Sequence, residues 1–142
     1  MIIGIDHGYG YIKTVNTVMS ASAARFDAEP PLLKNVVKYG DAYYALGGDR
    51  HPVKESKDAD DDYYVMTLGA IAEELKRRGM NTACVTLAAG LPLTRIGAEK
   101  ENFRRYLMRN GGARFDYEGK RYDVRITDCK MYPQGYASII RN

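Results

Sequence analysis

The segment that most constrains the fold is a glycine turn between two strand-like runs near the N-terminus. Met1–Ile5 is an apolar run of β-forming residues that leads into Asp6, and Tyr11–Val18 is a second strand-like run. Gly8 and Gly10 lie between the two runs and can adopt positive φ at no steric cost. The pattern predicts a β-hairpin with backbone amides exposed at its tip.

The hairpin carries residue types that suit a nucleoside triphosphate. Asp6 ends the first strand, and Lys13 follows on the second. Glycine lets backbone N–H groups approach phosphate oxygens, lysine supplies a compact positive charge, and a carboxylate can hold magnesium through water. The local pattern alone is compatible both with a phosphate-binding loop and with an ordinary turn that carries a surface lysine.

Two other phosphate-binding motifs do not fit this chain. The sequence contains no G-x-x-x-x-G-K-[ST] segment. The Gly8-x-Gly10 pair is followed by Lys13, where a dinucleotide-binding fingerprint requires glycine and then a helix. Here the loop leads into a strand instead.

The middle of the chain predicts two helices and a central strand. Apolar residues at helical spacing, with aspartates before them that can cap a helix, predict a helix over 63–78. The nearly continuous apolar run 82–89 predicts a central strand covered on both faces. A second amphipathic helix is predicted over 98–110, closing at Gly111-Gly112.

Further strands make the predicted sheet mixed rather than purely parallel. Residues 114–117 and 120–130 alternate in polarity and are joined at Glu118-Gly119, which predicts a hairpin. Residues 36–46 predict two short strands broken at Gly40-Asp41. The expected fold class is therefore α/β, with a mixed sheet and two flanking helices.

The remaining segments carry weaker signals. Residues 21–33 are expected to be irregular, and 51–62 is expected to be a solvent-exposed connector that ends in helix-capping aspartates. Residues 134–142 start as an apolar helix that stops without a C-terminal cap, so the chain is expected to be cut short.

Composition favours a soluble intracellular domain. The chain has 142 residues, enough for one domain, and its net charge of +3 comes from Lys and Arg residues interleaved with Asp and Glu. This interleaving argues against direct nucleic-acid binding. Cys84 and Cys129 lack the spacing of a zinc site and are expected in the core. No bilayer-spanning run or signal peptide is found, so the expected location is cytoplasmic, without membrane contact.

Short motifs along nearly the whole chain occur in an order that points to one family. With Asp6–Lys13 they are Asp61-Asp62-Tyr63-Tyr64, Leu91-Pro92-Leu93-Thr94, Asn102-Phe103-Arg104-Arg105, Gly111-Gly112 and Pro133-Gln134-Gly135-Tyr136. On this order the sequence resembles the N-terminal part of the ParM (StbA) family, the bacterial actin-like proteins that segregate plasmids.

The resemblance implies an actin-like, ribonuclease H-like N-terminal domain over residues 1–142, with a small β-rich inserted subdomain at about 26–57. It implies a second domain beyond Asn142 that completes a nucleotide cleft, so that this chain alone would be inactive. The full-length protein would be an ATPase that self-associates into filaments and moves plasmid DNA through a DNA-binding adaptor protein. It would not bind nucleic acid directly.

The same resemblance assigns roles to individual residues. Lys13 would contact the β- and γ-phosphates of ATP or GTP, and Asp6 would place Mg2+. Gln134 would act in catalysis by positioning the attacking water, because an amide can both accept and donate hydrogen bonds. The full set of residues expected at the nucleotide is Asp6, Gly8, Tyr9, Gly10, Tyr11 and Lys13.

Two hairpin residues depart from the family pattern. Tyr9 stands where a small hydroxyl residue is common, and its bulky side chain is expected to point away from the nucleotide. His7 stands where Asn or Asp is common, and a lone loop histidine is expected to be a solvated turn residue.

Two other functions stay open. A sugar or acetate kinase of the same superfamily shares the Asp-to-Lys hairpin but needs a catalytic acid that no residue clearly supplies. A non-enzymatic adaptor or nucleic-acid-binding module would draw on the basic pI and the twelve tyrosines, although core packing explains the tyrosines more simply. The basic face of Arg104, Arg105 and Arg109 is interpreted as solvated surface or as a contact between protomers.

Overall fold

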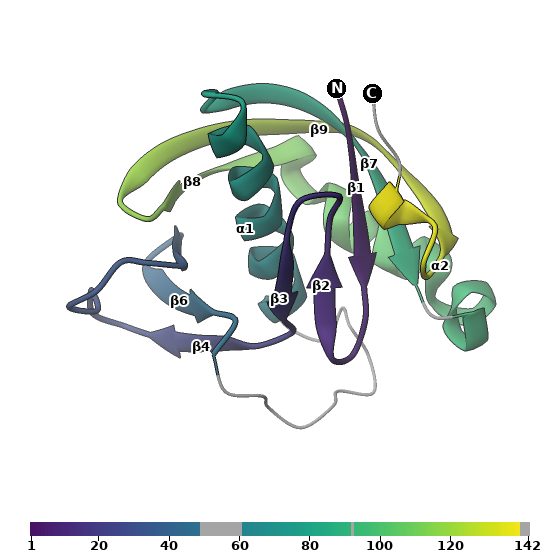
Figure 1. Cartoon of the computed structure of the whole chain (residues 1–142), viewed down its shortest axis with the longest axis horizontal. Coiled ribbons are helices and arrows are strands. Elements are labelled where there is room, and N and C mark those ends of the chain that lie inside the picture. The colour runs from purple at the N-terminus through teal and green to yellow at the C-terminus, as the bar shows by residue number, and fades with distance from the viewer. Residues whose placement is uncertain (49–60, 92, 140–142) are drawn as a thin grey trace.

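The computed structural model describes residues 1–48, 61–91 and 93–139, apart from the side chains of 93–98 and 138. Within these residues nine strands form one mixed sheet in the order β3-β2-β1-β7-β9-β8-β5-β6-β4 (Figure 1). The strands are β1 (Ile2–His7), β2 (Tyr11–Lys13), β3 (Val18–Ser20), β4 (Ala23–Phe26), β5 (Val36–Tyr39), β6 (Ala42–Leu46), β7 (Thr82–Leu91), β8 (Gly112–Tyr117) and β9 (Lys120–Pro133). The helices are α1 (Asp62–Arg77) and α2 (Leu93–Met108), with 3-10 turns η1 (Arg109–Gly111) and η2 (Ala137–Ile139).

Three parallel strands form the centre of the sheet. β7 pairs with β1 on one side and with β9 on the other, and both pairings are parallel. Asp6 of β1 lies beside Gly90 of β7, and Leu91 lies beside Pro133 of β9. The carboxyl ends of all three strands therefore meet at one edge, which is where open α/β sheets bind their ligands.

Helix α1 is enclosed by the sheet. It is buried almost continuously from Tyr63 to Leu75, and Figure 1 shows the strands curling around it. A helix that is apolar on nearly all sides needs cover on all sides, so the sheet closes over it instead of packing on one stripe. Gly69 makes part of this contact possible, because a Cβ there would collide with the Leu46 side chain of β6.

The central strand is covered on one face along its whole length but on the other face only near its end. Val85, Leu87 and Ala89 point into the core, as the apolar run predicted. On the opposite face Thr82 and Cys84 are exposed, so the expectation that Cys84 lies in the core is wrong, whereas Cys129 is buried as expected. The expectation that this strand is covered on both faces is therefore wrong for its first half, because both described helices lie on the other side of the sheet.

The second strand-like run is two strands rather than one. β2 ends at Lys13 and β3 begins at Val18, with a turn between them. The Thr14 hydroxyl oxygen accepts hydrogen bonds from the backbone N–H groups of Asn16 and Thr17. Thr14 and Asn16 also donate to the buried carboxylate of Glu74 on α1, at 3.3 and 3.0 Å. A polar anchor on the helix thus bends a segment whose residue types favour a strand.

The segment expected to be irregular, 21–33, contains β4, an edge strand that pairs with β6. Its residues alternate poorly in burial, which explains why sequence periodicity missed it. The hairpin of β5 and β6 is confirmed, with Gly40 at φ 61° in the turn. β5 continues the main sheet by pairing with β8, so these strands join the same sheet. Most of the predicted connector over 51–62 lies outside the described residues.

The other predicted elements are confirmed with changed ends. The hairpin of β8 and β9 turns through Glu118 and Gly119, at φ 53° and 80°, as a primed turn requires. α2 starts before the predicted residue 98, at Leu93. Residues 134–139 form a turn followed by η2 rather than a regular helix.

The cap of α1 differs from the prediction. Asp61 occupies the N-cap position, but its side chain makes no capping hydrogen bond. Its carboxylate lies 2.8 Å from a guanidinium nitrogen of Arg109 instead. None of the helices in the described ranges is long and apolar enough to cross a bilayer.

We predict that Gly69→Ala destabilises the protein by a net ~1 kcal/mol, because overpacking of the contact between α1 and β6 outweighs the gain in helix propensity of about 1 kcal/mol. Thermal or urea denaturation measures the change. Gly48→Ala is the matched control, since a Cβ at Gly48 meets nothing within 4 Å. Equal stability of the two variants would contradict the enclosure of α1.

The two cysteines should differ in reactivity. Cys129 is buried, and this burial raises the pKa of its thiol to about 12, whereas Cys84 is exposed. In the native protein a maleimide should label Cys84 within minutes and leave Cys129 unmodified until denaturant is added. Cys84→Ser should abolish the fast phase, as mass spectrometry of the labelled protein would show. Fast labelling of Cys84→Ser would contradict the burial of Cys129.

Candidate functional site

The edge where β1, β7 and β9 end gathers most of the residues singled out in the sequence. After β9 the chain turns across this edge, and the N–H of Gln134 donates to the carbonyl of Leu91 at 2.6 Å. The next amide, of Gly135, donates to Oδ1 of Asp6 at 3.0 Å. The carboxylate of Asp6 is 3% exposed. Backbone hydrogen bonds therefore bring Gln134 and Asp6, distant in the sequence, to the same place.

Gly90 makes room for the Asp6 carboxylate. A Cβ at Gly90 would collide with Oδ1 of Asp6 and would lie 3.3 Å from the Cβ of Ala137 in η2. The carboxylate thus lies against bare backbone of β7, with the turn after β9 closing over it. This close approach gives Gly90 a packing role that its position in an apolar run did not indicate.

The hairpin register sets Lys13 against Asp6. β1 and β2 are antiparallel, with Asp6 opposite Lys13 and His7 opposite Ile12. Residues directly opposite each other in such a pair project from the same face of the sheet. Lys13 is exposed while Asp6 is buried. The Lys13 side chain therefore lies at the surface, on the same face of the sheet as the buried carboxylate of Asp6.

Gly8 is required by close packing. Its φ is not in the positive range, contrary to the expectation for this turn, and its N–H donates to the Tyr11 carbonyl at 3.0 Å. This amide is therefore used within the hairpin and is not exposed at the tip. A Cβ on Gly8 would lie 2.8 Å from Nε2 of Gln134, so glycine lets the Gln134 amide reach the loop.

His7 is buried, and the expectation of a solvated turn residue is wrong. Its ring is 0% exposed, and Nε2 lies 2.9 Å from the Thr67 hydroxyl of α1. The edge of the ring meets Phe103 of α2, with centroids 5.0 Å apart and planes at 82°. Because alternate residues of a strand point to opposite faces, His7 faces the helices while Asp6 faces the other side.

The remaining loop residues, Tyr9, Gly10 and Tyr11, make different contacts. The Tyr9 side chain is half-buried and its hydroxyl oxygen is buried, so the phenol points into the protein. The carbonyl of Gly10 accepts the N–H of Ala21 at 3.0 Å, which ties the loop to the end of β3. Tyr11 is 47% exposed and lines a pocket elsewhere.

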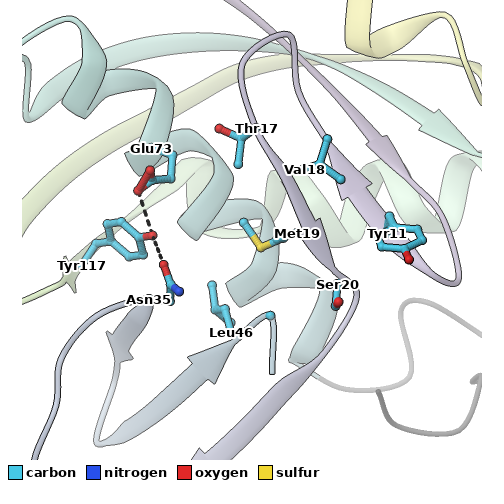
Figure 2. Close-up of a pocket in the computed structure, with 10 residues that line it drawn as sticks. Tyr11, Thr17, Val18, Met19, Ser20, Asn35, Leu46, Glu73 and Tyr117 are labelled. Carbon is cyan, nitrogen blue, oxygen red and sulfur yellow. Dashed lines mark hydrogen bonds between the residues drawn. The ribbon is translucent and has the colours of Figure 1, made fainter. Parts of the chain in front are cut away.

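That pocket, of about 350 Å3, lies between β3, β6 and α1 rather than at the strand ends (Figure 2). On one side the Tyr117 hydroxyl lies 2.9 Å from Oε2 of Glu73 and 3.4 Å from Oδ1 of Asn35, and Tyr11 stands on the opposite side. Burial and the neighbouring Glu73 carboxylate raise the pKa of Tyr117 well above its usual range. A carboxylate in the wall repels phosphate, so the pocket is a poor site for a nucleotide.

The described side chains do not form a metal site by themselves. No group of three or more His, Cys, Asp or Glu residues lies close enough to hold a metal ion among the residues with described positions. Asp6 contributes one buried carboxylate, with one oxygen bonded to Gly135. This donor fits a magnesium ion whose other ligands are water and phosphate oxygens.

Arg104 and Arg109 are half-buried and contact other elements, which corrects the expectation that the basic face of Arg104, Arg105 and Arg109 is solvated throughout. Nε of Arg104 donates to the Cys129 carbonyl at 3.0 Å. The Arg109 guanidinium lies 3.8 Å from the ring centroid of Tyr64, whose pKa is raised to about 12, chiefly by burial. Two of these three arginines therefore hold α2 and η1 against the rest of the fold.

Two residues at the site were not selected from the sequence. The Tyr63 hydroxyl donates to the Gly8 carbonyl at 3.0 Å, and Thr67 bonds His7. Both belong to α1 but lie outside its predicted apolar positions. Tyr63 belongs to the family motif Asp61-Asp62-Tyr63-Tyr64, which gave it no role at the site, and Thr67 had no signal beyond its polar group one turn later.

Known proteins with this fold include actin homologues. An archaeal actin homologue, Ta0583, matches with a TM-score of 0.69 and 18% identity over 94% of this chain and 46% of its own. The Alp12 filament structure matches with a TM-score of 0.64 and 17% identity, over 93% of this chain and 46% of its own. ParM of Bacillus thuringiensis with AMPPNP matches with a TM-score of 0.63 and 18% identity, over 91% and 44%.

The chain spans a little under half the length of these three structures. At such identities the similarity shows the fold alone. No curated protein matches the sequence. A family model described as "Actin like proteins N terminal domain" matches residues 4–136, which is most of the chain. The chain therefore belongs to the actin-like proteins, within their N-terminal domain family.

Proposed function

We propose that this chain supplies one side of the nucleotide site of an actin-like ATPase that forms filaments and partitions plasmids. The observation that carries the proposal is the meeting of Asp6, Lys13, Gly8 and Gln134 at the carboxyl ends of three parallel strands. Similarity to a ParM protein with AMPPNP and to an Alp12 filament supports it.

The family resemblance assigns a role to each residue, and the environment of each residue is compatible with that role. Lys13 is exposed opposite Asp6 and would bind the β- and γ-phosphates. Asp6 would hold magnesium through water, and magnesium bound with the triphosphate would neutralise charge on the phosphate oxygens. Gln134 is exposed beside Gly8 and would hold the attacking water through its amide.

The proposal also covers the rest of the hairpin loop, a second domain and further partners. Tyr9, Gly10 and Tyr11 belong to the proposed site through the backbone of the loop. A second domain would supply the other side of the cleft, so residues 1–142 would be the N-terminal domain, with about 26–57 as an inserted subdomain. We further propose that GTP can replace ATP. The protein would be cytoplasmic and would reach plasmid DNA through a DNA-binding adaptor protein.

Lys13→Ala should weaken the affinity of the full-length protein for MgATP by about ten- to a hundredfold, because a charge-assisted contact to phosphate is lost. Isothermal titration calorimetry measures the affinity. Lys120→Ala is the control, since Lys120 is an exposed lysine at the start of β9, the end far from the site. Equal affinities for the two variants would exclude Lys13 from the phosphate site.

Filament formation gives the broader test. The full-length protein should pellet in sedimentation with MgATP and not without nucleotide. Gln134→Ala should pellet to the same extent but release phosphate at least tenfold more slowly, because the water loses its positioning group. Its pellets should therefore persist for longer. Absence of nucleotide-dependent pelleting over a wide range of concentration would count against the filament proposal.

A further inference from the structure

A chain of hydrogen bonds ties the phosphate hairpin to the first turns of α1. Nε2 of His7 lies 2.9 Å from the Thr67 hydroxyl, and that hydroxyl lies 2.7 Å from the Tyr63 carbonyl. The Tyr63 hydroxyl then returns to the hairpin, 3.0 Å from the Gly8 carbonyl. Two adjacent hairpin residues, His7 and Gly8, are thus held by two α1 residues one turn apart. We call these four residues the helix clamp.

The direction of each bond follows from proton counting. The Thr67 hydroxyl has one proton, which it donates to the carbonyl of Tyr63. It must therefore accept its bond from His7, so Nε2 of His7 carries a proton. The His7 ring is also fixed by the edge contact with Phe103. The ring is consequently a donor with a set orientation, and its bond to α1 anchors the end of β1.

The clamp fixes the peptide groups on both sides of Gly8. The Gly8 N–H donates to Tyr11 within the hairpin, and the Gly8 carbonyl accepts from Tyr63. Peptide bonds are planar and none in the described chain is cis, so fixing the Gly8 carbonyl also fixes the direction of the next N–H, that of Tyr9. Glycine alone would leave these peptides free to rotate.

We propose that Tyr63 and Thr67, acting through His7 and Gly8, are positioning residues that hold the loop in one conformation for phosphate binding. The inference rests on the proposed nucleotide function of the hairpin. A loop ordered before the ligand arrives binds more tightly, because less conformational entropy is lost on binding. The clamp also joins the loop to the helix that the whole sheet encloses.

The variants Tyr63→Phe and Thr67→Val test the clamp by removing one hydroxyl each with little change of shape. Tyr117→Phe is the matched control, because Tyr117 is equally buried and its hydroxyl also bonds α1, at Glu73. The described hydrogen bonds of the Tyr117 hydroxyl go to Asn35 and Glu73 and not to the hairpin tip. Each variant removes one hydroxyl that links α1 to another element. Tyr63→Phe loses the bond to Gly8, Thr67→Val loses the bonds to His7 and to the Tyr63 carbonyl, and Tyr117→Phe loses the bond to Glu73. Only the first two variants loosen the clamp.

The first measurement is amide hydrogen exchange of the full-length protein without nucleotide. Loss of a hydrogen bond worth ~1 kcal/mol corresponds to about fivefold faster exchange. Tyr63→Phe and Thr67→Val should show this increase at residues 8–11, and Tyr117→Phe should change them less than twofold. Amides of the β8–β9 hairpin report any global loss of stability. Equal exchange at residues 8–11 in all three variants overturns the clamp.

The second measurement is the affinity for MgATP. Tyr63→Phe and Thr67→Val should bind about fivefold more weakly than Tyr117→Phe. Unchanged affinity, in variants whose hairpin exchanges faster, overturns the positioning role. A wild-type protein that binds no MgATP refutes the proposed nucleotide function instead, and the exchange data then decide by themselves whether α1 holds the loop.

Discussion

The enclosure of α1 is the interaction on which the rest of the structure depends. Residues from Tyr63 to Leu75 are almost all buried, so the helix can be stable only inside the curled sheet. Its few polar side chains then become internal anchors for other elements. Glu74 bends the chain between β2 and β3, Glu73 receives Tyr117 from β8, and Tyr63 holds Gly8. The helix therefore orders both the hydrophobic core and the polar contacts.

The hairpin from Asp6 to Lys13 illustrates how this ordering reaches the proposed site. On the helix side, His7 and the Gly8 carbonyl are bonded to α1. On the other side, Asp6 accepts the Gly135 amide and fits against Gly90. A loop of small residues is flexible by itself, and here both faces of its supporting strand are fixed by neighbours. Precise placement of the buried Asp6 carboxylate beneath the exposed Lys13 needs such support, since an exposed charge such as Lys13 stabilises little by itself.

Charge also separates the site from the nearby pocket. The pocket between β3, β6 and α1 has the volume of a small-molecule site, but Glu73 in its wall disfavours anions. The strand ends present Lys13 at the surface and an amide from Gln134. Cavity size and chemistry thus point to different places, and the chemistry is the better guide to a phosphate ligand.

The sequence by itself determined most of the regular elements and the existence of the hairpin, but not β4 or the break between β2 and β3. Period-2 and helical patterns are local, so β1, α1, the β5–β6 hairpin and the β8–β9 hairpin could be predicted within a few residues. Spacing within the hairpin also nominated Asp6 and Lys13, which the register then set opposite each other. The order of the short motifs indicated the family, and the family model over residues 4–136 confirms it.

Only the tertiary structure decided which groups are buried and what they touch. His7 and Arg109 are residue types common at surfaces, yet His7 is buried and Arg109 is half-buried, each against partners from elements far along the chain. Gly8 and Gly90 serve close approach to Gln134 and Asp6, which depends on where β7 and β9 end in space. Residue types and local spacing contain no information about such long-range contacts, whereas folding of the sheet around α1 creates them.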